Sequence, residues 1–314
     1  MISFTRTASG GVPDVSVARL TANNTLRADL VGYLLALRQT KGQLTRPPHL
    51  RHRAWRHGKG ISMANFNQRL HETSDKLTAH VCTIPSATVT QAMAAAGADA
   101  VIIDMEHGAV DYASAHAMIA ATQGTKCAPI VRVAENDPVQ VKRVLDLGAQ
   151  GLCFPMIRTA EDARKAVASL YYPPKGNRGF GPFIAHSAAG VPLLEYKDAV
   201  DGTLTCILLV ETADAIESIE EIAAVPGIDL LVPAQFDLST DLGISGQFDH
   251  PDFRAAIAKV EKAANDAGVP LGNVAMTPQQ ATGLFAKGYR VICGFDLLWL
   301  KAKTSETQGW LGTD

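Results

Sequence analysis

The chain has 314 residues, of which 47% are hydrophobic and 19% are charged, and its formal net charge is −2 at pH 7. A chain of this length and hydrophobicity has enough apolar material for one large globular domain or two small ones. The near-neutral charge gives no reason to expect a nucleic acid as a partner. No uncharged apolar run approaches the roughly 20 residues of a membrane-spanning helix, so we expect no membrane partner.

The five cysteines are scattered along the chain and form no Cys-x-x-Cys pair. An odd, unpatterned set of thiols is typical of a cytosolic protein, so we expect a cytoplasmic location with reduced cysteines. Free cysteine is among the most buried residue types. We therefore expect these side chains to fill the core rather than to act as nucleophiles.

Residues 1–62 differ from the rest of the chain, because they carry ten arginines and lysines and only two acidic residues. We expect most of this basic extension to be poorly ordered, followed by one catalytic domain over residues 63–314. An Arg-rich, acid-poor leader resembles an organelle transit peptide. Met63 opens a stretch that is typical of a natural start, so we favour the interpretation that residues 1–62 are not native.

From Met63 onward, strand-like and helix-like segments alternate. Apolar runs of strand length lie at 79–84, 100–103, 129–133, 151–155, 206–210, 230–233, 271–275 and 291–294. Helix-like stretches lie at 90–96, 139–147, 160–170, 213–223, 251–267 and 277–286. Several of them begin after an N-cap residue such as Thr159 or end before a glycine such as Gly268, which is typical of helices.

Eight strand–helix alternations over about 250 residues predict an α/β fold of the (β/α)8 TIM barrel type. The alternative is an open, doubly wound parallel sheet. No Gly-x-Gly-x-x-Gly follows a strand-like run, so the dinucleotide site that is common in that alternative has no support.

Polar, titratable side chains follow several of the apolar runs. They are Asp104, Glu106 and His107 after the second run, Arg132 in the third, Glu211 after the fifth and Asp237 past the sixth. Because the carboxyl ends of barrel strands meet at one rim, we expect these side chains to lie together. Taken alone, Asp104 also fits a structural cap, and Glu106 fits a group that supports its neighbours.

These residue types can support metal-assisted proton chemistry. Glu211 and Asp237 can bind one hard divalent cation, which leaves positions open for a chelating substrate such as a 2-oxo acid. A cation so placed is a Lewis acid for a developing enolate, and Arg132 adds a second positive group. His107 is the natural proton carrier, because the unperturbed pKa of histidine lies near neutrality.

Six separated motifs carry a resemblance to a known family. They are Asp104-Met105-Glu106-His107-Gly108, Arg132-Val133-Ala134-Glu135-Asn136-Asp137-Pro138, Leu145-Asp146-Leu147-Gly148-Ala149, Tyr172-Pro173-Pro174-Lys175-Gly176-Asn177-Arg178-Gly179, Val210-Glu211-Thr212 and Asp237-Leu238-Ser239. In this order and spacing they resemble the class II pyruvate aldolases of the HpcH/HpaI (4-hydroxy-2-oxo-heptanedioate aldolase and citrate lyase) family. The resemblance covers about residues 63–301, and it implies a TIM barrel of the phosphoenolpyruvate/pyruvate-binding type.

The resemblance implies a role for each matching position. His107 matches the general base, acting through a water, and Asp146 matches the acid that raises the basicity of that histidine. Arg132 matches the group that stabilises the transition state. Glu211 and Asp237 match the ligands of a divalent cation, which would be Mg²⁺, Mn²⁺ or Co²⁺.

The remaining positions bear on substrate binding and assembly. The resemblance places Asp104 with the catalytic residues, and Phe236 with Asp237 in the segment that holds the pyruvate carboxylate. Arg178 either orders the preceding Pro-Pro loop or faces the aldehyde end of the substrate. Family members typically form hexamers with sites near subunit contacts, so the resemblance implies a homo-oligomer, as a hexamer or trimer of dimers.

Two departures from the family pattern concern the substrate pocket. The family usually has a glutamine two residues before the metal-binding glutamate, where this chain has Leu209. The family also has Gly-Pro-x-Asp before the second ligand, where this chain has Gln235 and Phe236 ahead of Asp237. Gln235 is a candidate for supplying the missing amide. The identity of the substrate is therefore not carried over.

The resemblance and the motifs together predict a metal-dependent aldolase that reversibly cleaves a 4-hydroxy-2-oxo acid to pyruvate and an aldehyde. A first alternative is a decarboxylating or condensing enzyme of the macrophomate synthase kind on the same scaffold, which Leu209 and Phe236 leave open. A second alternative is a non-catalytic oligomeric barrel. The complete set of His107, Arg132 and Glu211 argues against it, because a structural role needs none of them.

Overall fold

The structure is a computed structural model, and it describes residues 66–312. The basic extension over residues 1–62 and the start at Met63 therefore lie outside the described residues. Within the described part of the chain, no helix is long and apolar enough to cross a membrane.

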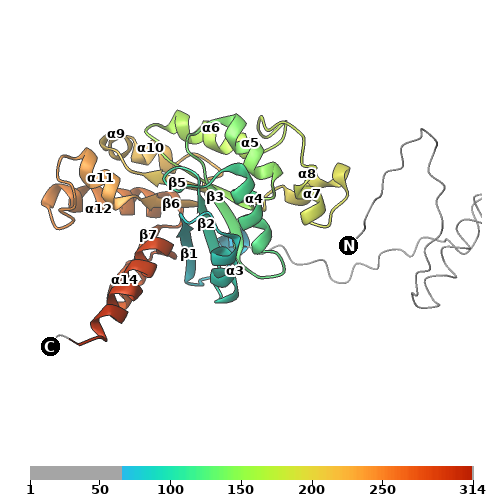
Figure 1. The fold of residues 1–314 in the computed structure, drawn as a ribbon. Helices are drawn as coiled ribbons and strands as arrows, with labels where there is room; N and C mark the ends of the chain where they lie inside the picture. Colours follow the sequence, from blue (N-terminus) through green and yellow to red (C-terminus); the bar gives the residue numbers. More distant parts are fainter. Residues whose placement is uncertain (1–65, 313–314) are drawn as a thin grey trace, which may run out of the picture. The chain divides into compact units, whose positions relative to one another are not determined.

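Eight parallel strands form the centre of the fold (Figure 1). They are β1 (Leu77–Cys82), β2 (Ala100–Asp104), β3 (Ala128–Arg132), β4 (Gly151–Phe154), β5 (Thr205–Val210), β6 (Leu230–Pro233), β7 (Gly272–Val274) and β8 (Val291–Cys293). Their order in the sheet is β6-β5-β4-β3-β2-β1-β8-β7. A parallel bridge between Leu231 in β6 and Leu271, directly before β7, joins the two ends. The predicted barrel is confirmed, and the open sheet is wrong.

Most of the strands are apolar on both faces, because one face lines the barrel interior and the other lies under helices. In β2, Ala100 and Ile102 belong to the interior cluster, whereas Val101 and Ile103 pack in the layer between strands and helices. This alternation explains why the strands are continuous apolar runs in the sequence. It also places the last interior-facing residue of each strand at the rim, where the barrel opens.

Helices surround the strands. The longer ones are α2 (Phe66–Glu72), α3 (Ala87–Ala95), α4 (Tyr112–Ala121), α5 (Pro138–Asp146), α6 (Ala160–Leu170), α11 (Gln235–Asp241), α12 (Pro251–Ala267), α13 (Pro278–Ala286) and α14 (Asp296–Gly309). The capping signals are confirmed: Thr159 and Thr277 form capping boxes, and Gly268 ends α12 in the left-handed conformation. The helix predicted over 213–223 is broken at Ser218 into α9 (Ala213–Glu217) and α10 (Ile219–Ala223).

The connection between α6 and β5 is the longest in the barrel, over residues 171–204. It contains the short α7 (Ala185–Ala188), a 3-10 turn (Leu193–Glu195) and α8 (Tyr196–Val200). Its own small apolar cluster is formed by Tyr172, Ala185, Tyr196 and Val200. Because it follows the end of α6 and precedes the start of β5, it lies at the amino end of the strands, opposite the rim.

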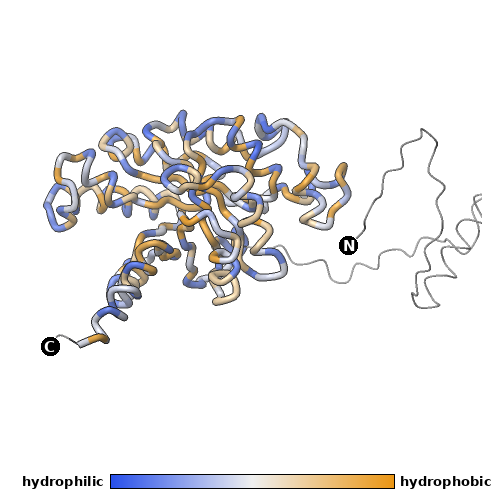
Figure 2. Tube along the Cα trace, in the orientation of Figure 1, coloured by the Kyte–Doolittle hydropathy of each residue, from blue (hydrophilic) through white to orange (hydrophobic). Residues whose placement is uncertain are grey.

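Helix α14 points away from the strands instead of lying along them (Figure 1). Its first residue, Asp296, is buried and accepts hydrogen bonds from the Thr83 hydroxyl and the Ile84 backbone N–H. The next turn is apolar but exposed: 51% of Leu297 and 58% of Leu300 are accessible to solvent. Figure 2 shows this hydrophobic start of α14 outside the apolar centre of the barrel.

Candidate active site

The centre of the candidate site is an ion pair between neighbouring strand ends. Asp104 ends β2 and Arg132 ends β3, and the two residues are paired in the parallel register. Arg132 donates two hydrogen bonds to the Asp104 carboxylate, from Nε to Oδ1 at 2.8 Å and from Nη2 to Oδ2 at 2.5 Å. The Asp104 side chain is fully buried and that of Arg132 nearly so. Both planar groups are thereby held in one orientation.

Asp104 also organises the loop that follows β2. Its Oδ1 accepts hydrogen bonds from the backbone N–H groups of Glu106 at 3.0 Å and His107 at 3.2 Å. The carboxylate is therefore a structural cap and a partner of Arg132 at once, so the two interpretations of this residue are not exclusive. The turn needs Gly108, because a Cβ there would lie 2.3 Å from the Asp104 carbonyl oxygen.

The electrostatics of this pair keep both groups charged. Burial alone would raise the pKa of Asp104, but the hydrogen bonds and charge of Arg132, with the N–H groups of His107 and Glu106, outweigh it and lower that pKa. Burial likewise disfavours the charged guanidinium, yet Asp104 raises the pKa of Arg132. Arg132 is thus a fixed positive charge at the barrel mouth.

Glu106 and His107 lie beside this positive charge. Arg132 Nη1 is 3.2 Å from Glu106 Oε2. Burial raises the pKa of Glu106, with Asp104 and Asp237 adding to the effect and Arg132 opposing it. His107 Nε2 is 3.7 Å from Glu106 Oε2, which is beyond hydrogen-bond distance, and 64% of the imidazole side chain is exposed. The imidazole is therefore available to a substrate or to another group that comes from outside.

Glu211 follows β5 and is buried at the same rim. Its Oε1 accepts a hydrogen bond from the Met156 backbone N–H. Met156 has φ +54°, a left-handed conformation that non-glycine residues rarely adopt, and that cost is typical of functional sites. Burial raises the pKa of Glu211 to about 7, with Glu106 and Asp237 adding to the effect and the Met156 N–H and Arg132 opposing it.

The donor set suits a small divalent cation. Asp237 lies in the first turn of α11, and its charge acts on both Glu211 and Glu106. Within residues 66–312 no group of three His, Cys, Asp or Glu side chains could hold a metal ion. Mg²⁺ needs only one or two carboxylates, since water and substrate oxygens occupy its other positions. Glu211 and Asp237 therefore fit such an ion, and the excess of negative charge around Glu211 favours one.

A mostly apolar cavity of about 70 Å³ opens between these groups. Arg132 and Asp237 lie at its edge, and its wall includes Leu209, which is buried in the interior cluster. Phe236 is half exposed and packs edge-to-face on Phe248, with the ring centroids 5.6 Å apart. Leu209 makes the pocket less polar than a pocket with a glutamine at this position.

Gln235 is held by a neighbour on the next strand. Its Nε2 donates a hydrogen bond to Asn273 Oδ1 at 2.5 Å, and Asn273 is buried in β7. One N–H of the Gln235 amide is therefore committed to Asn273. The sequence offered no signal for this contact, or for the left-handed Met156, because both depend on which strands become neighbours.

Two of the predicted site residues, Asp146 and Arg178, lie away from the rim. Asp146 ends α5, which runs from the rim back to the amino end of the strands, and Arg178 lies in the connection after α6. Arg178 Nη2 donates a hydrogen bond to Asp146 Oδ1 at 2.8 Å. Within the described chain Asp146 binds Arg178, and its pairing with His107 stays a prediction. The acid was placed by a motif, and a motif does not show which end of its helix faces the rim.

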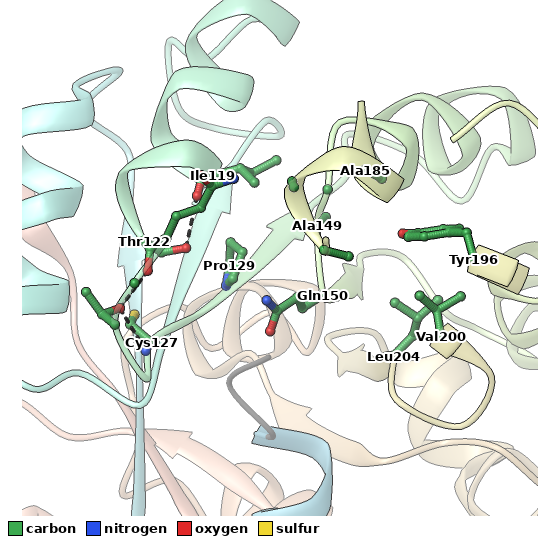
Figure 3. A pocket seen from close by; sticks show the side chains of 16 residues that line it. Ile119, Thr122, Cys127, Pro129, Ala149, Gln150, Ala185, Tyr196, Val200 and Leu204 are labelled. Carbon is green, nitrogen blue, oxygen red and sulfur yellow. Dashed lines mark hydrogen bonds between the residues drawn. The ribbon is translucent and has the colours of Figure 1, made fainter. Parts of the chain in front are cut away.

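A second cavity, of about 90 Å³, also lies at the amino end of the barrel (Figure 3). Thr122, Gln150 and Tyr196 supply polar groups to its lining, and no Asp, Glu, Lys, Arg or His takes part in it. This cavity therefore offers no acid, base or charged group for catalysis. The five cysteines are all free and buried, as expected for core residues.

Comparison with known proteins agrees with this geometry. The family described as HpcH/HpaI aldolase/citrate lyase matches residues 83–301. A 2-dehydro-3,6-dideoxy-6-sulfogluconate aldolase of Pseudomonas putida is 38% identical over 222 residues, which cover 70% of this chain and 87% of the relative. A 4-hydroxy-2-oxo-heptane-1,7-dioate aldolase of Salmonella typhimurium strain LT2 is 35% identical over 188 residues, which cover 59% of this chain and 72% of the relative.

Solved structures of similar proteins extend the match. An HpcH/HpaI aldolase/citrate lyase family protein from Burkholderia cenocepacia J2315 has a TM-score of 0.75 and 33% identity, covering 79% of this chain and 99% of that one. Macrophomate synthase has a TM-score of 0.70 and 28% identity, covering 80% of this chain and 91% of that one. The family match spans well over half of the chain, together with the barrel and its rim. The chain belongs to the HpcH/HpaI aldolase/citrate lyase family.

Proposed function

We propose that this protein is a metal-dependent aldolase that reversibly cleaves a 4-hydroxy-2-oxo acid to pyruvate and an aldehyde. The observation that carries the proposal is the grouping of the Asp104–Arg132 pair, Glu211 and Asp237 at one rim, where Arg132 and Asp237 line a cavity and His107 is exposed. The names of the relatives, which are aldolases of oxo acids, support the same reaction class.

Glu211 and Asp237 would hold the divalent cation, which we propose to be Mg²⁺, Mn²⁺ or Co²⁺. When bound, such an ion supplies Lewis acidity to the oxygens of the oxo acid. Glu211 needs to lose its proton before it can act as a ligand, because the carboxylate and not the carboxylic acid binds metal. Its raised pKa therefore makes metal binding dependent on pH near neutrality.

The chain's own residues divide the remaining work. His107 accepts the proton of the substrate 4-hydroxyl through a water, as the aldehyde carbonyl forms and the bond between carbons 3 and 4 breaks. The electron pair of that bond passes to carbon 3, so negative charge grows on the 2-oxo oxygen. Arg132, already fixed by Asp104, stabilises that charge without reorganising. A proton then returns to carbon 3 and yields the methyl group of pyruvate.

We also propose that the acid next to His107 is Asp146 of a neighbouring copy. Within one chain Asp146 lies at the opposite end of the barrel, whereas the family resemblance pairs it with the base. A contact between two copies of the chain would account for both observations, and the exposed imidazole of His107 leaves room for such a contact. The apolar start of α14 supports assembly as well, because exposed Leu297 and Leu300 are typical of a buried interface. We expect a hexamer or trimer of dimers that acts in the cytoplasm.

A second candidate is a decarboxylating or condensing reaction on the same metal site. The buried Leu209 favours it, because no amide at this position can hydrogen-bond the oxo acid. The structural likeness to macrophomate synthase also supports this candidate. A non-catalytic barrel has no comparable support, because it does not account for a buried acid and a strained Met156 at one rim.

The test is pyruvate release from a panel of 4-hydroxy-2-oxo acids, followed by coupling to lactate dehydrogenase. The full chain is assayed with Mg²⁺, Mn²⁺, Co²⁺ or a chelator. Metal-dependent pyruvate is the expected result, and the best substrate then defines the pocket around Phe236. If folded, metal-loaded protein releases no pyruvate from any 4-hydroxy-2-oxo acid but converts oxaloacetate to CO₂ and pyruvate, or to CO₂ and a condensation product with an added acceptor, the second candidate is supported instead.

A further inference from the structure

Arg178 is a buried cation whose role is not explained by the rim chemistry. Its side chain has no exposed surface. Among the described residues it forms an ion pair with Asp146, in which Arg178 also donates a hydrogen bond. Its Nε and Nη1 have no hydrogen-bond partner among the residues described. A buried guanidinium with unpaired N–H groups costs stability. Such a cost is typical of positions that serve a function.

The backbone around Arg178 is fixed by α6. The N–H of Asn177 donates to the Ala168 carbonyl at 2.9 Å, and the N–H of Arg178 donates to the Tyr171 carbonyl at 3.0 Å. Gly176 is pressed so closely on α6 that a Cβ there would lie 2.1 Å from the Ala168 carbonyl oxygen. The loop therefore fixes the backbone position from which the Arg178 side chain extends.

Aromatic side chains fix the guanidinium itself. Its central carbon lies 4.5 Å from the centroid of the Tyr172 ring, within the range of a cation–π contact. Burial raises the pKa of Tyr196, and the charge of Arg178 opposes that rise, so the Tyr196 hydroxyl faces the same group. Tyr196 comes from α8 and also lines the cavity at this end of the barrel (Figure 3). Arg178 is thus held by the backbone of its own loop and by the side chains of Tyr172 and Tyr196.

The carboxylate that Arg178 holds is only partly buried. Asp146 keeps 21% of its side chain exposed, and its Oδ1 is the oxygen that Arg178 binds. Its Oδ2 faces Gly181, where a Cβ would lie 3.4 Å away, so a larger residue there would crowd this oxygen. Next to it, 68% of Phe183 is exposed. The result is a rigidly held carboxylate with one tied oxygen, next to an exposed aromatic surface.

We propose that Arg178 is a positioning residue that holds Asp146 so that its second oxygen meets the imidazole of His107 in a neighbouring copy. This inference rests on the proposed supply of Asp146 between copies. A carboxylate held in one orientation fixes the tautomer of the histidine and raises its basicity. The buried Arg178 therefore acts on the reaction through Asp146, without touching the substrate.

The first experiment is a comparison of Arg178→Gln, Arg178→Lys, Asp146→Asn and the double variant Arg178→Gln/Asp146→Asn. We expect Arg178→Gln to lower kcat by roughly tenfold or more and to move the pH profile of kcat as Asp146→Asn does. The double variant should lose no more than Asp146→Asn alone, because Arg178 acts through Asp146. The matched control is Arg164→Gln, which removes an exposed arginine–carboxylate pair with Glu161 and should leave both kcat and the profile unchanged.

The second experiment mixes chains of impaired activity, and a return of activity also shows that each variant folds. His107→Ala chains and Arg178→Gln chains are unfolded together and refolded into mixed oligomers. Activity should return, because an intact His107 can then meet an intact Asp146 and Arg178 from the other chain. A mixture of His107→Ala with Arg132→Gln should stay inactive, because these two residues belong to one rim.

The outcomes separate the two ideas. If Arg178→Gln keeps the kcat and pH profile of the parent while Asp146→Asn loses them, Arg178 has no positioning role. The same conclusion follows if His107→Ala is rescued by Asp146→Asn chains but not by Arg178→Gln chains. If Asp146→Asn itself is fully active, the supply of Asp146 between copies is wrong, and this inference is wrong with it.

Discussion

Arg132 and Asp104 bind each other through two hydrogen bonds at the ends of adjacent parallel strands, at 2.8 Å and 2.5 Å. The Asp104 carboxylate, in turn, accepts hydrogen bonds from two N–H groups of the Glu106–His107 loop. One buried carboxylate therefore sets both the direction of the fixed positive charge and the path of the loop that carries the base. We therefore expect stability and the proposed catalysis to depend on the same contact.

Removal of one partner of this pair should destabilise the protein strongly. Asp104→Ala leaves the Arg132 guanidinium buried without its carboxylate, and we expect the free energy of unfolding to fall by about 3–5 kcal/mol. Urea denaturation measures the change. The control is Asp111→Ala, which removes the exposed cap of α4 and should lower the free energy of unfolding much less.

The double variant Asp104→Leu/Arg132→Met checks the cause of that loss. Replacement of a buried ion pair by apolar side chains is often neutral or stabilising, so this variant should be more stable than Asp104→Ala, although inactive. If Asp104→Ala unfolds at the same urea concentration as the parent, the pair does not support the rim.

Metal binding should depend on pH through Glu211. Because the carboxylate binds the cation and its pKa is raised to about 7, the apparent Mn²⁺ affinity should fall about tenfold per pH unit below that value. Calorimetric titration between pH 5.5 and 8 measures it. Glu211→Ala should abolish Mn²⁺-dependent stabilisation and turnover, and a variant that still gains stability from Mn²⁺ would exclude Glu211 as a ligand.

The metal-free protein should show the opposite trend in stability. The pKa of Glu211 in the folded state is about 7, whereas the unfolded state releases this proton near the ordinary value of 4.5. The folded state therefore binds more protons between these values, and the free energy of unfolding falls as pH rises through this window. Below pH 4.5 this contribution is fully present. In the presence of chelator, Glu211→Gln should remove this part of the pH dependence.

The apolar wall of the cavity should weaken binding of the oxo acid. Leu209→Gln introduces an amide where the family usually has one, and we expect the KM for pyruvate in the condensation direction to fall several-fold while kcat changes little. Burial of the amide without a partner should lower the stability of the ligand-free protein by about 1–3 kcal/mol. Leu209→Met is the control, because it changes shape without adding a polar group. An unchanged KM in Leu209→Gln would show that this position does not contact the substrate.

The apolar start of α14 should be an interface between copies. In the double variant Leu297→Ser/Leu300→Ser we expect a smaller assembly than in the parent, as measured by light scattering after size exclusion. The control is Lys303→Ala, which lies further along the same helix and loses an exposed pair with Glu306 and a cation–π contact with Trp310. If the double variant keeps the parent's mass, α14 does not hold the assembly together.

The sequence predicted the strands of this fold well, because each buried parallel strand is a continuous apolar run. The predicted run at 230–233 coincides with β6, and the other seven differ from the observed strands by a few residues at the ends. Helices with a capping residue or a final glycine were also predicted closely, as for α6 after Thr159 and α12 before Gly268. Helix α14 was not predicted, because its hydropathy pattern does not show an apolar face against its own barrel.

The rim residues were predictable for the same reason. Parallel strands of a barrel all end at one rim, so side chains directly after apolar runs meet there whatever their separation in the sequence. This rule does not apply to Asp146, because Asp146 lies at the end of a helix and not of a strand. A helix that follows a barrel strand runs back to the amino end, which carries Asp146 away from His107.

By itself the sequence determined the barrel, its order of elements and the residue types at its rim, since hydrophobic periodicity and strand ends are local properties. Only the tertiary structure decided which charges meet: Arg132 with Asp104 at the rim, and Arg178 with Asp146 at the opposite end. It also decided the left-handed Met156 that faces Glu211 and the outward direction of α14. Pairings of this kind depend on distances between distant segments, which no local pattern of residues encodes.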